Sequence, residues 1–94
     1  MIEVRIAELA GNFAENKDIA KEIRENTIIP AIASGEVVVL RFDNVDSTTQ
    51  SFIHALISGV FHTLGEPALD LLEFKKCNRA VKSLIATVIN YSLE

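Results

Sequence analysis

The sequence predicts an α/β domain in which helices pack on a small, mostly parallel sheet. Segments with the patterns of strands and helices alternate in the order β-α-β-α-β-α, which is typical of parallel strands joined by right-handed crossovers. The length of 94 residues suits one domain. A hydrophobic content of 49% and a charged content of 23% exclude a disordered chain. We therefore expect residues 1–94 to form a single domain.

The first strand is indicated by an alternation of residue types. Three apolar residues, Ile2, Val4 and Ile6, are separated by charged ones, which predicts a half-exposed strand at an edge of the sheet. The residues that follow, 7–14, are a candidate for a short second strand, antiparallel to the first.

The first helix is expected over residues 16–29. The segment is highly charged, but apolar side chains recur in it every three or four residues, as in an amphipathic helix. Asn16 is a good N-cap residue. Pro30 is expected to end or kink the helix because it lacks an N–H group, although residues 31–33 could add one more turn.

The remaining elements follow from runs of apolar residues. Residues 37–42 are almost continuously apolar, which predicts a central strand covered on both faces. A second helix with a wide apolar face is expected over residues 50–64, since Gly65 and Pro67 stop it. Residues 69–74 are expected to be the third strand. A third helix follows over residues 80–93, with Asn78 as its N-cap.

Two loops, residues 43–49 and 75–78, each end a predicted strand and open a helix. In a parallel sheet these loops lie at the carboxyl edge, where ligands bind, and helix N-termini there favour anions. The edge is therefore a candidate site for an anion or a phosphorylated hydroxyl. Its candidate residues are Asp46, Ser47, Thr48 and Thr49 in the first loop and Lys75, Lys76 and Arg79 in and after the second. The alternative is that Asp46, Ser47 or Thr48 only caps the second helix while the lysines are solvated.

Other residue types with catalytic or metal-binding chemistry give no comparable pattern. His54 and His62 are eight residues apart on one helix, about 12 Å, and cannot share a metal ion. Cys77 lies beside two lysines that favour a thiolate, but a packing role is the preferred interpretation. The chain has no glycine-rich phosphate loop and no nucleophile-elbow motif. We expect a protein that is not an enzyme and binds no cofactor or metal.

Charge and hydropathy exclude further classes. The net charge is −4, from 9 basic and 13 acidic residues, and an acidic chain is a poor general binder of nucleic acid. No apolar run reaches the roughly 18 residues that a membrane span needs, and the first residues lack the pattern of a secretory signal. A single cysteine excludes a disulfide within the chain. A cytoplasmic protein without membrane contact is expected.

Three short segments resemble those of a known family. They are RFDNV at residues 41–45, TQSF at 49–52 and NRAVKSLI at 78–85. Together they are similar to the STAS domain superfamily, the fold of anti-sigma-factor antagonists. The closer resemblance is to the STAS-like family of uncharacterised small bacterial proteins, and it covers about residues 11–92.

This resemblance implies a STAS-like fold and a regulatory protein-interaction domain. Anti-sigma-factor antagonists bind a histidine-kinase-like ATPase, which phosphorylates a hydroxyl at the start of the helix after the central strand. By resemblance, Thr48 occupies the acceptor position, Ser47 precedes it, and Thr49 stands in place of a glycine. Two other hypotheses stay open. One is a small-ligand or nucleotide-sensing module that uses the edge near Thr48, Lys75 and Lys76. The other is a homo-oligomer that pairs through the first strand or an exposed apolar patch.

Overall fold

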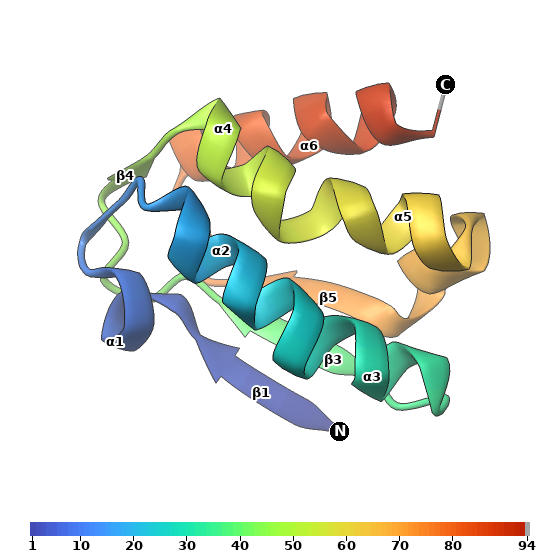
Figure 1. The fold of residues 1–94 in the computed structure, drawn as a ribbon. Coiled ribbons are helices and arrows are strands. Elements are labelled where there is room, and N and C mark those ends of the chain that lie inside the picture. Colours follow the sequence, from blue (N-terminus) through green and yellow to red (C-terminus); the bar gives the residue numbers. More distant parts are fainter. Residues whose placement is uncertain (94) are drawn as a thin grey trace.

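The structure is a computed structural model, and it describes residues 1–93. Three parallel strands form the main sheet of the protein (Figure 1). The strands are β1 (Ile2–Arg5), β3 (Val38–Arg41) and β5 (Leu72–Lys75), in the order β1-β3-β5. Both neighbouring pairs are parallel. The predicted α/β class with a small parallel sheet is therefore confirmed.

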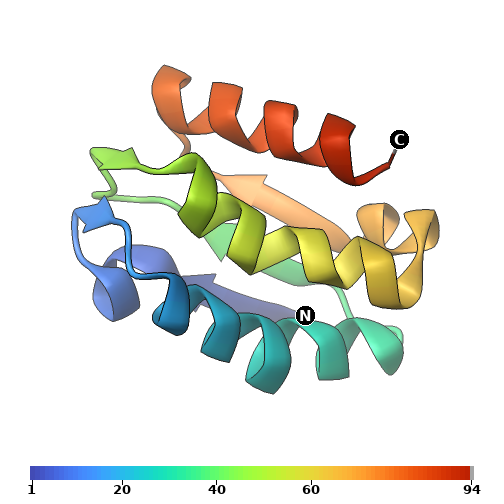
Figure 2. The ribbon, with the colours of Figure 1, turned by 45° about the horizontal axis from the view of Figure 1, so that its top comes forward.

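Three long helical rods pack on this sheet (Figures 1 and 2). The first consists of α2 (Lys17–Ile23), the π-helical segment η1 (Arg24–Ile28) and α3 (Ile29–Ala33). The second consists of α4 (Gln50–Ile53), the π-helical segment η2 (His54–Ser58) and α5 (Gly59–Leu64). The third is α6 (Arg79–Ser92). Smaller elements are α1 (Ile6–Ala10), the 3-10 helix η3 (Glu66–Leu71), and a second sheet of β2 (Phe13–Ala14) and β4 (Ser47–Thr48).

All three rods lie on the same face of the main sheet (Figure 2). For the two rods that connect the strands, the cause is the strand order, because β1, β3 and β5 follow one another across the sheet in a single direction. Right-handed crossovers that advance in one direction always pass over the same face. β3 is the central strand and is buried on both faces, as predicted, but helices cover only one of these faces. We call the uncovered side the open face.

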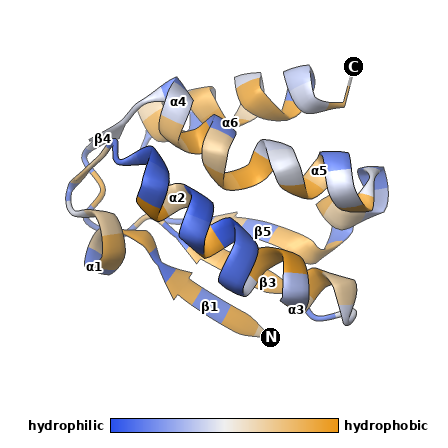
Figure 3. Cartoon of the chain, in the orientation of Figure 1, coloured by the Kyte–Doolittle hydropathy of each residue, from blue (hydrophilic) through white to orange (hydrophobic). Residues whose placement is uncertain are grey.

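Side chains separate into two sets across the sheet. Val38 and Leu40 point toward the rods and are completely buried, and hydrophobic and hydrophilic residues alternate along β1 (Figure 3). The open face instead carries two rows, which the strand register aligns as Glu3-Val39-Glu73 and Arg5-Arg41-Lys75. Val39 is only 1% exposed, yet its neighbours across the strands are carboxylates. It is therefore covered by charged side chains rather than by the core.

The hydrophobic core fills the layer between the sheet and the rods. The second rod is central to it, since three consecutive turns of that rod present fully buried side chains. The largest buried side chains of the sheet and the rods include Leu40, Phe42, Phe52, Ile53, Leu56, Ile57 and Val60. Burying one such side chain contributes about 1.5–3 kcal/mol. The wide apolar face predicted for residues 50–64 is thus confirmed.

Pro30 does not end the first rod, and the further turn over residues 31–33 that the sequence left open is present. The N–H of Ile29 donates to the carbonyl of Arg24, five residues earlier, so the turn before the proline is a wide π turn. A proline ring clashes with the carbonyl of the preceding turn in a regular α-helix. A π turn at that place changes the carbonyl positions, and the rod continues through Pro30 to Ala33.

Two other expectations for short segments are wrong. Residues 7–14 do not pair antiparallel with β1. They form α1, a turn at Gly11 with φ 82°, and β2, which pairs parallel with β4 in a stretch expected to be a loop. The third strand begins at Leu72 rather than at residue 69, because the chain from Glu66 to Leu71 is a 3-10 helix with a proline near its start, where the fixed φ of proline is favourable.

The two π-helical segments contact each other through Arg24. Its Nη1 donates to the backbone carbonyl of Ala55 at 2.9 Å. The arginine side chain lies across Gly59, where an added Cβ would be only 2.9 Å from the Arg24 Cδ. A π turn displaces helix carbonyls from their regular partners, and Arg24 supplies a partner from the neighbouring rod.

Gly59→Ala is expected to destabilise the protein by about 1 kcal/mol, although alanine is normally better than glycine in a helix by a similar amount. The new methyl group displaces Arg24 and breaks its bond to Ala55, which is worth about 1.5–3 kcal/mol. In an Arg24→Ala background the same substitution should instead stabilise. Urea unfolding of the four proteins measures the difference, and equal effects in both backgrounds would disprove the contact.

The open face predicts an unusual response at Val39. Val39→Asp puts a third carboxylate between Glu3 and Glu73 and should cost about 1–2 kcal/mol more than Val39→Lys. Leu40→Asp, by contrast, places an unpaired charge in the core and should prevent folding. Thermal unfolding followed by circular dichroism should therefore rank the variants from most to least stable as Val39→Lys, Val39→Asp and Leu40→Asp. If Val39→Lys unfolds the protein as completely as Leu40→Asp does, Val39 lies in a second core.

Candidate functional site

The two loops at the carboxyl edge of the main sheet meet, as the sequence predicts. The N–H of Phe42 donates to the carbonyl of Lys75 at 2.9 Å, which joins the ends of β3 and β5. Asn78 then bridges the loops, because its Nδ2 donates to the carbonyl of Asp46 at 2.8 Å. The Oδ1 of the same side chain accepts the N–H of Val81 at 2.9 Å. Asn78 is therefore the expected N-cap of α6 and also the tether of the first loop.

The first loop is held from its other side by the segment before β2. The carbonyl of Asn12 accepts the N–H groups of Asp46 at 2.8 Å and Ser47 at 3.3 Å. The Asn12 side chain also donates to the Asp46 carboxylate at 3.4 Å. The backbone at residues 46–47 is thus fixed between Asn12 and Asn78, although the Asp46 and Ser47 side chains are exposed.

The three hydroxyls of the loop have different surroundings. Thr48 is half-buried, and its Oγ1 donates to the carbonyl of Ala14 at 2.6 Å. Thr49 is the N-cap of α4, since its Oγ1 accepts the N–H of Phe52 at 3.0 Å. Ser47 is exposed and forms no side-chain hydrogen bond within residues 1–93.

The capping alternative named Asp46, Ser47 or Thr48, and none of these residues caps the helix. Pairing of β4 with β2 holds Ser47 and Thr48 extended, so the helix begins later and the cap falls on Thr49, whose backbone is also extended. The sequence pattern missed this because the two-residue strand has no pattern of its own.

The basic candidates do not converge on one point. Lys75 belongs to the basic row of the open face, and its Nζ lies 3.9 Å from the Glu73 carboxylate. Lys76 is exposed in the loop with a left-handed φ of 60°. Arg79 is exposed as the first residue of α6. Lys76 and Arg79 therefore remain the basic residues of the loop edge, and anion binding there stays a prediction.

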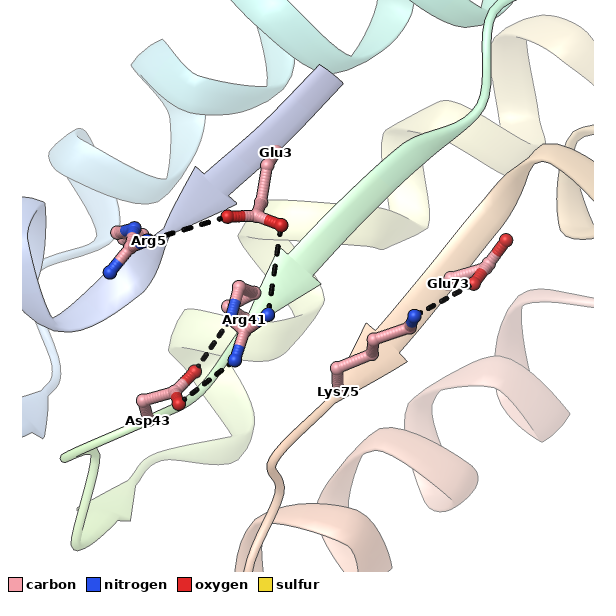
Figure 4. A network of polar contacts seen from close by, with 6 residues as sticks. All are labelled: Glu3, Arg5, Arg41, Asp43, Glu73 and Lys75. Atoms are coloured by element: carbon pink, nitrogen blue, oxygen red, sulfur yellow. Dashed lines mark hydrogen bonds and ion pairs between the residues drawn. The ribbon is translucent and has the colours of Figure 1, made fainter. Parts of the chain in front are cut away.

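Arg41 is the centre of a polar network on the open face, next to the loops (Figure 4). Its Nε and Nη2 donate to the two oxygens of Asp43 at 2.9 and 3.1 Å, and its Nη1 lies 3.6 Å from Glu3. Glu3 also pairs with Arg5 at 3.6 Å. The sequence analysis missed this cluster, although an arginine and an aspartate two residues apart at the end of a strand were a signal for it.

The network shifts the proton equilibria of its central pair. The hydrogen bonds from Arg41 lower the pKa of the Asp43 carboxyl, while its partial desolvation acts in the opposite direction. The bonds to Asp43 raise the pKa of Arg41 in turn. Both groups therefore stay charged near neutral pH and fix the first residues of the loop at residues 43–49.

The histidines lie away from this edge. His54 and His62 are exposed on the second rod, where they line a groove with Tyr91 of α6. Within residues 1–93 no three His, Cys, Asp or Glu side chains are placed to hold a metal ion. None of the helices described in this range has the length and apolar character required to cross a membrane.

Cys77 lies in the second loop and is half-buried. Burial raises the pKa of its thiol, and the charge of Lys82 compensates only in part. The thiol is therefore protonated near neutral pH, which agrees with the packing role preferred from the sequence rather than with a reactive thiolate.

Substitutions at Asn78 can separate its two roles. Asn78→Asp keeps a good N-cap for α6 but loses the donor to Asp46, whereas Asn78→Ala loses both and should cost about 1–2 kcal/mol more stability. Both variants should speed hydrogen exchange at the Asp46 and Ser47 amides. If exchange there is unchanged in both variants, Asn78 does not hold the loop.

Comparison with known proteins adds one finding to this geometry. A family model described as a STAS-like domain of unknown function matches residues 20–82. That range contains both loops and Asn78, and it leaves out β1, α1 and β2. No curated protein and no solved structure matches the chain.

Proposed function

The chain belongs to the family of STAS-like domains of unknown function, and on that premise we propose that it is a non-enzymatic regulatory module that binds another protein. Its resemblance to anti-sigma-factor antagonists indicates a histidine-kinase-like ATPase as the partner. The contact surface is the loop at residues 46–49, together with Lys76 and Arg79. Phosphorylation of a loop hydroxyl controls binding.

The observation that carries this proposal is the fixed backbone beneath an exposed hydroxyl. Two backbone hydrogen bonds, from the N–H groups of Asp46 and Ser47 to the Asn12 carbonyl, hold the loop. A third bond, from the Asn78 side chain to the Asp46 carbonyl, holds it from the other side. A surface ordered before binding loses less conformational entropy in a complex. The Ser47 side chain is exposed on this surface, as recognition by a kinase requires.

Ser47 suits phosphorylation better than Thr48. The resemblance assigns the acceptor position to Thr48, but the Thr48 hydroxyl donates to Ala14 at 2.6 Å and must give up that bond to react. In the reaction the Ser47 Oγ attacks the γ-phosphorus of ATP, ADP leaves, and the hydroxyl proton passes to a base of the kinase. Nearly two negative charges then lie beside Asp46, and like-charge repulsion there changes the surface that the partner meets.

A small-ligand or nucleotide-sensing module is the alternative. Ligand sites of open α/β sheets form where the strand order reverses and leaves a crevice. The order β1-β3-β5 has no reversal, and Lys75 lies on the open face. These observations favour the protein-interaction proposal.

The test uses the purified chain, a histidine-kinase-like ATPase from the same genome and ATP. Mass spectrometry is expected to find one phosphate on Ser47, which Ser47→Ala abolishes. Thr48→Val removes the bond to Ala14 but leaves Ser47 intact, and it should still be modified. Ser47→Glu should weaken binding to the ATPase at least about tenfold.

Three results would contradict the proposal. Phosphate on Thr48 would return the acceptor to the position given by the resemblance. Modification outside residues 46–49 would remove the loop from the mechanism. Equal binding of the ATPase by the wild type and by Ser47→Glu would mean that negative charge at the loop does not control this binding.

A further inference from the structure

The main sheet has two free edges within residues 1–93, β1 and β5. Each edge carries an apolar residue between an acidic and a basic one, as Glu3-Val4-Arg5 and Glu73-Phe74-Lys75. An edge strand with unpaired backbone groups is a template for another strand. The surroundings of the two edges decide which of them is suited to pairing.

The surface beside the β5 edge is more apolar than the surface beside the β1 edge. A groove between β5 and α6 is lined by two lysines, Lys76 and Lys82, and by the apolar residues Phe74, Cys77, Ile85, Ala86 and Ile89. The last three recur along one side of α6, and Phe74 is only half-buried. At the other edge Val4 is 7% exposed. The shallow hollow beside it is lined by the apolar Ile2 and Leu9, but three charged residues, Glu3, Arg5 and Glu8, also line it. Of the two free edges, β5 therefore adjoins the more apolar surface.

The backbone of β5 presents the correct groups at its centre. The carbonyl of Lys75 accepts the N–H of Phe42 and therefore points toward β3. Backbone groups of successive residues in a strand point to opposite sides, so the N–H and C=O of Phe74 point away from the sheet. In an antiparallel pair, a residue with both groups directed outward can exchange two hydrogen bonds with the residue opposite.

The side chains fit the same arrangement. When Phe74 pairs with Phe74 of a second copy across a twofold axis, Glu73 lies opposite Lys75 of that copy, and the reverse. Opposite charges that face each other across strands are stabilising. Within one chain the Glu73 and Lys75 charges are 3.9 Å apart and about half exposed, so both remain available. The two Phe74 rings meet on the side of the rods, beside the grooves of α6.

We propose that a second copy of this chain pairs with β5 antiparallel, about a twofold axis at Phe74. The two main sheets then form one continuous sheet of six strands. The α6 helices lie antiparallel on either side of the axis and cover the apolar grooves. An isologous contact of this kind closes at two copies. Joining β5 to β1 of the next copy would instead be head-to-tail and would continue without limit.

Sedimentation equilibrium of the wild type and charge variants tests the proposal. The wild type is expected to pass from 10.3 kDa to twice that mass between roughly 10 µM and 1 mM. Glu73→Lys and Lys75→Glu each place like charges opposite one another, twice by symmetry, and should weaken association about tenfold. An equimolar mixture of the two variants should associate again, because both cross-strand pairs are then of opposite sign.

The matched control is Arg5→Glu, which makes the equivalent change at the β1 edge and should leave the association constant unchanged. Circular dichroism verifies that each variant folds. A monomeric wild type at 1 mM would overturn the proposal, as would a mixture that fails to associate. Association weakened equally by Arg5→Glu, or growth beyond two copies, would indicate head-to-tail pairing and would also overturn it.

Discussion

The one-directional growth of the main sheet is the constraint on which the rest of this structure depends. Each crossover is right-handed, and the strands follow one another as β1-β3-β5, so the two rods that connect them must lie on the same face. The third rod, α6, packs beside the second on that face (Figure 2). Parallel sheets usually have helices on both faces. This sheet instead has a core on one side and charged residues on the other. Its carboxyl edge has no crevice at a reversal of strand order, and the loops there can hold each other directly.

Hydrogen bonds hold the two loops at the carboxyl edge of the main sheet in place. Asn78 caps α6 and holds Asp46, while Asn12 holds the same loop from the side of β2. The open face adds Arg41, which fixes Asp43 at the start of the loop. A short chain with a modest core thus presents an ordered surface without a disulfide or a metal ion in the part that the structure describes. It is on this ordered surface that the proposed binding of another protein rests.

Much of this architecture could be predicted from the sequence, because periodic burial leaves a direct pattern. The alternation at β1, the apolar face of the second rod and the cap at Asn78 were all predicted. Where a pattern fits two structures, the sequence misleads. The continuous apolar run at β3 suits a strand with helices on both faces, but on one face Val39 is covered by the side chains of Glu3 and Glu73 from the neighbouring strands. Likewise, β4 forms because it pairs with β2, and the helix continues through Pro30 because a π turn precedes the proline. Neither the pairing nor the π turn has a local sequence pattern.

The most direct test of the one-sided sheet is the accessibility of its two faces in solution. A soluble paramagnetic probe attenuates the NMR signals of groups near solvent. The structure predicts strong attenuation of side-chain signals from Arg41 and Glu73 and weak attenuation of the methyl groups of Val38 and Leu40, which are fully buried. Equal protection of the two sets would mean that another layer covers the open face and would contradict the account.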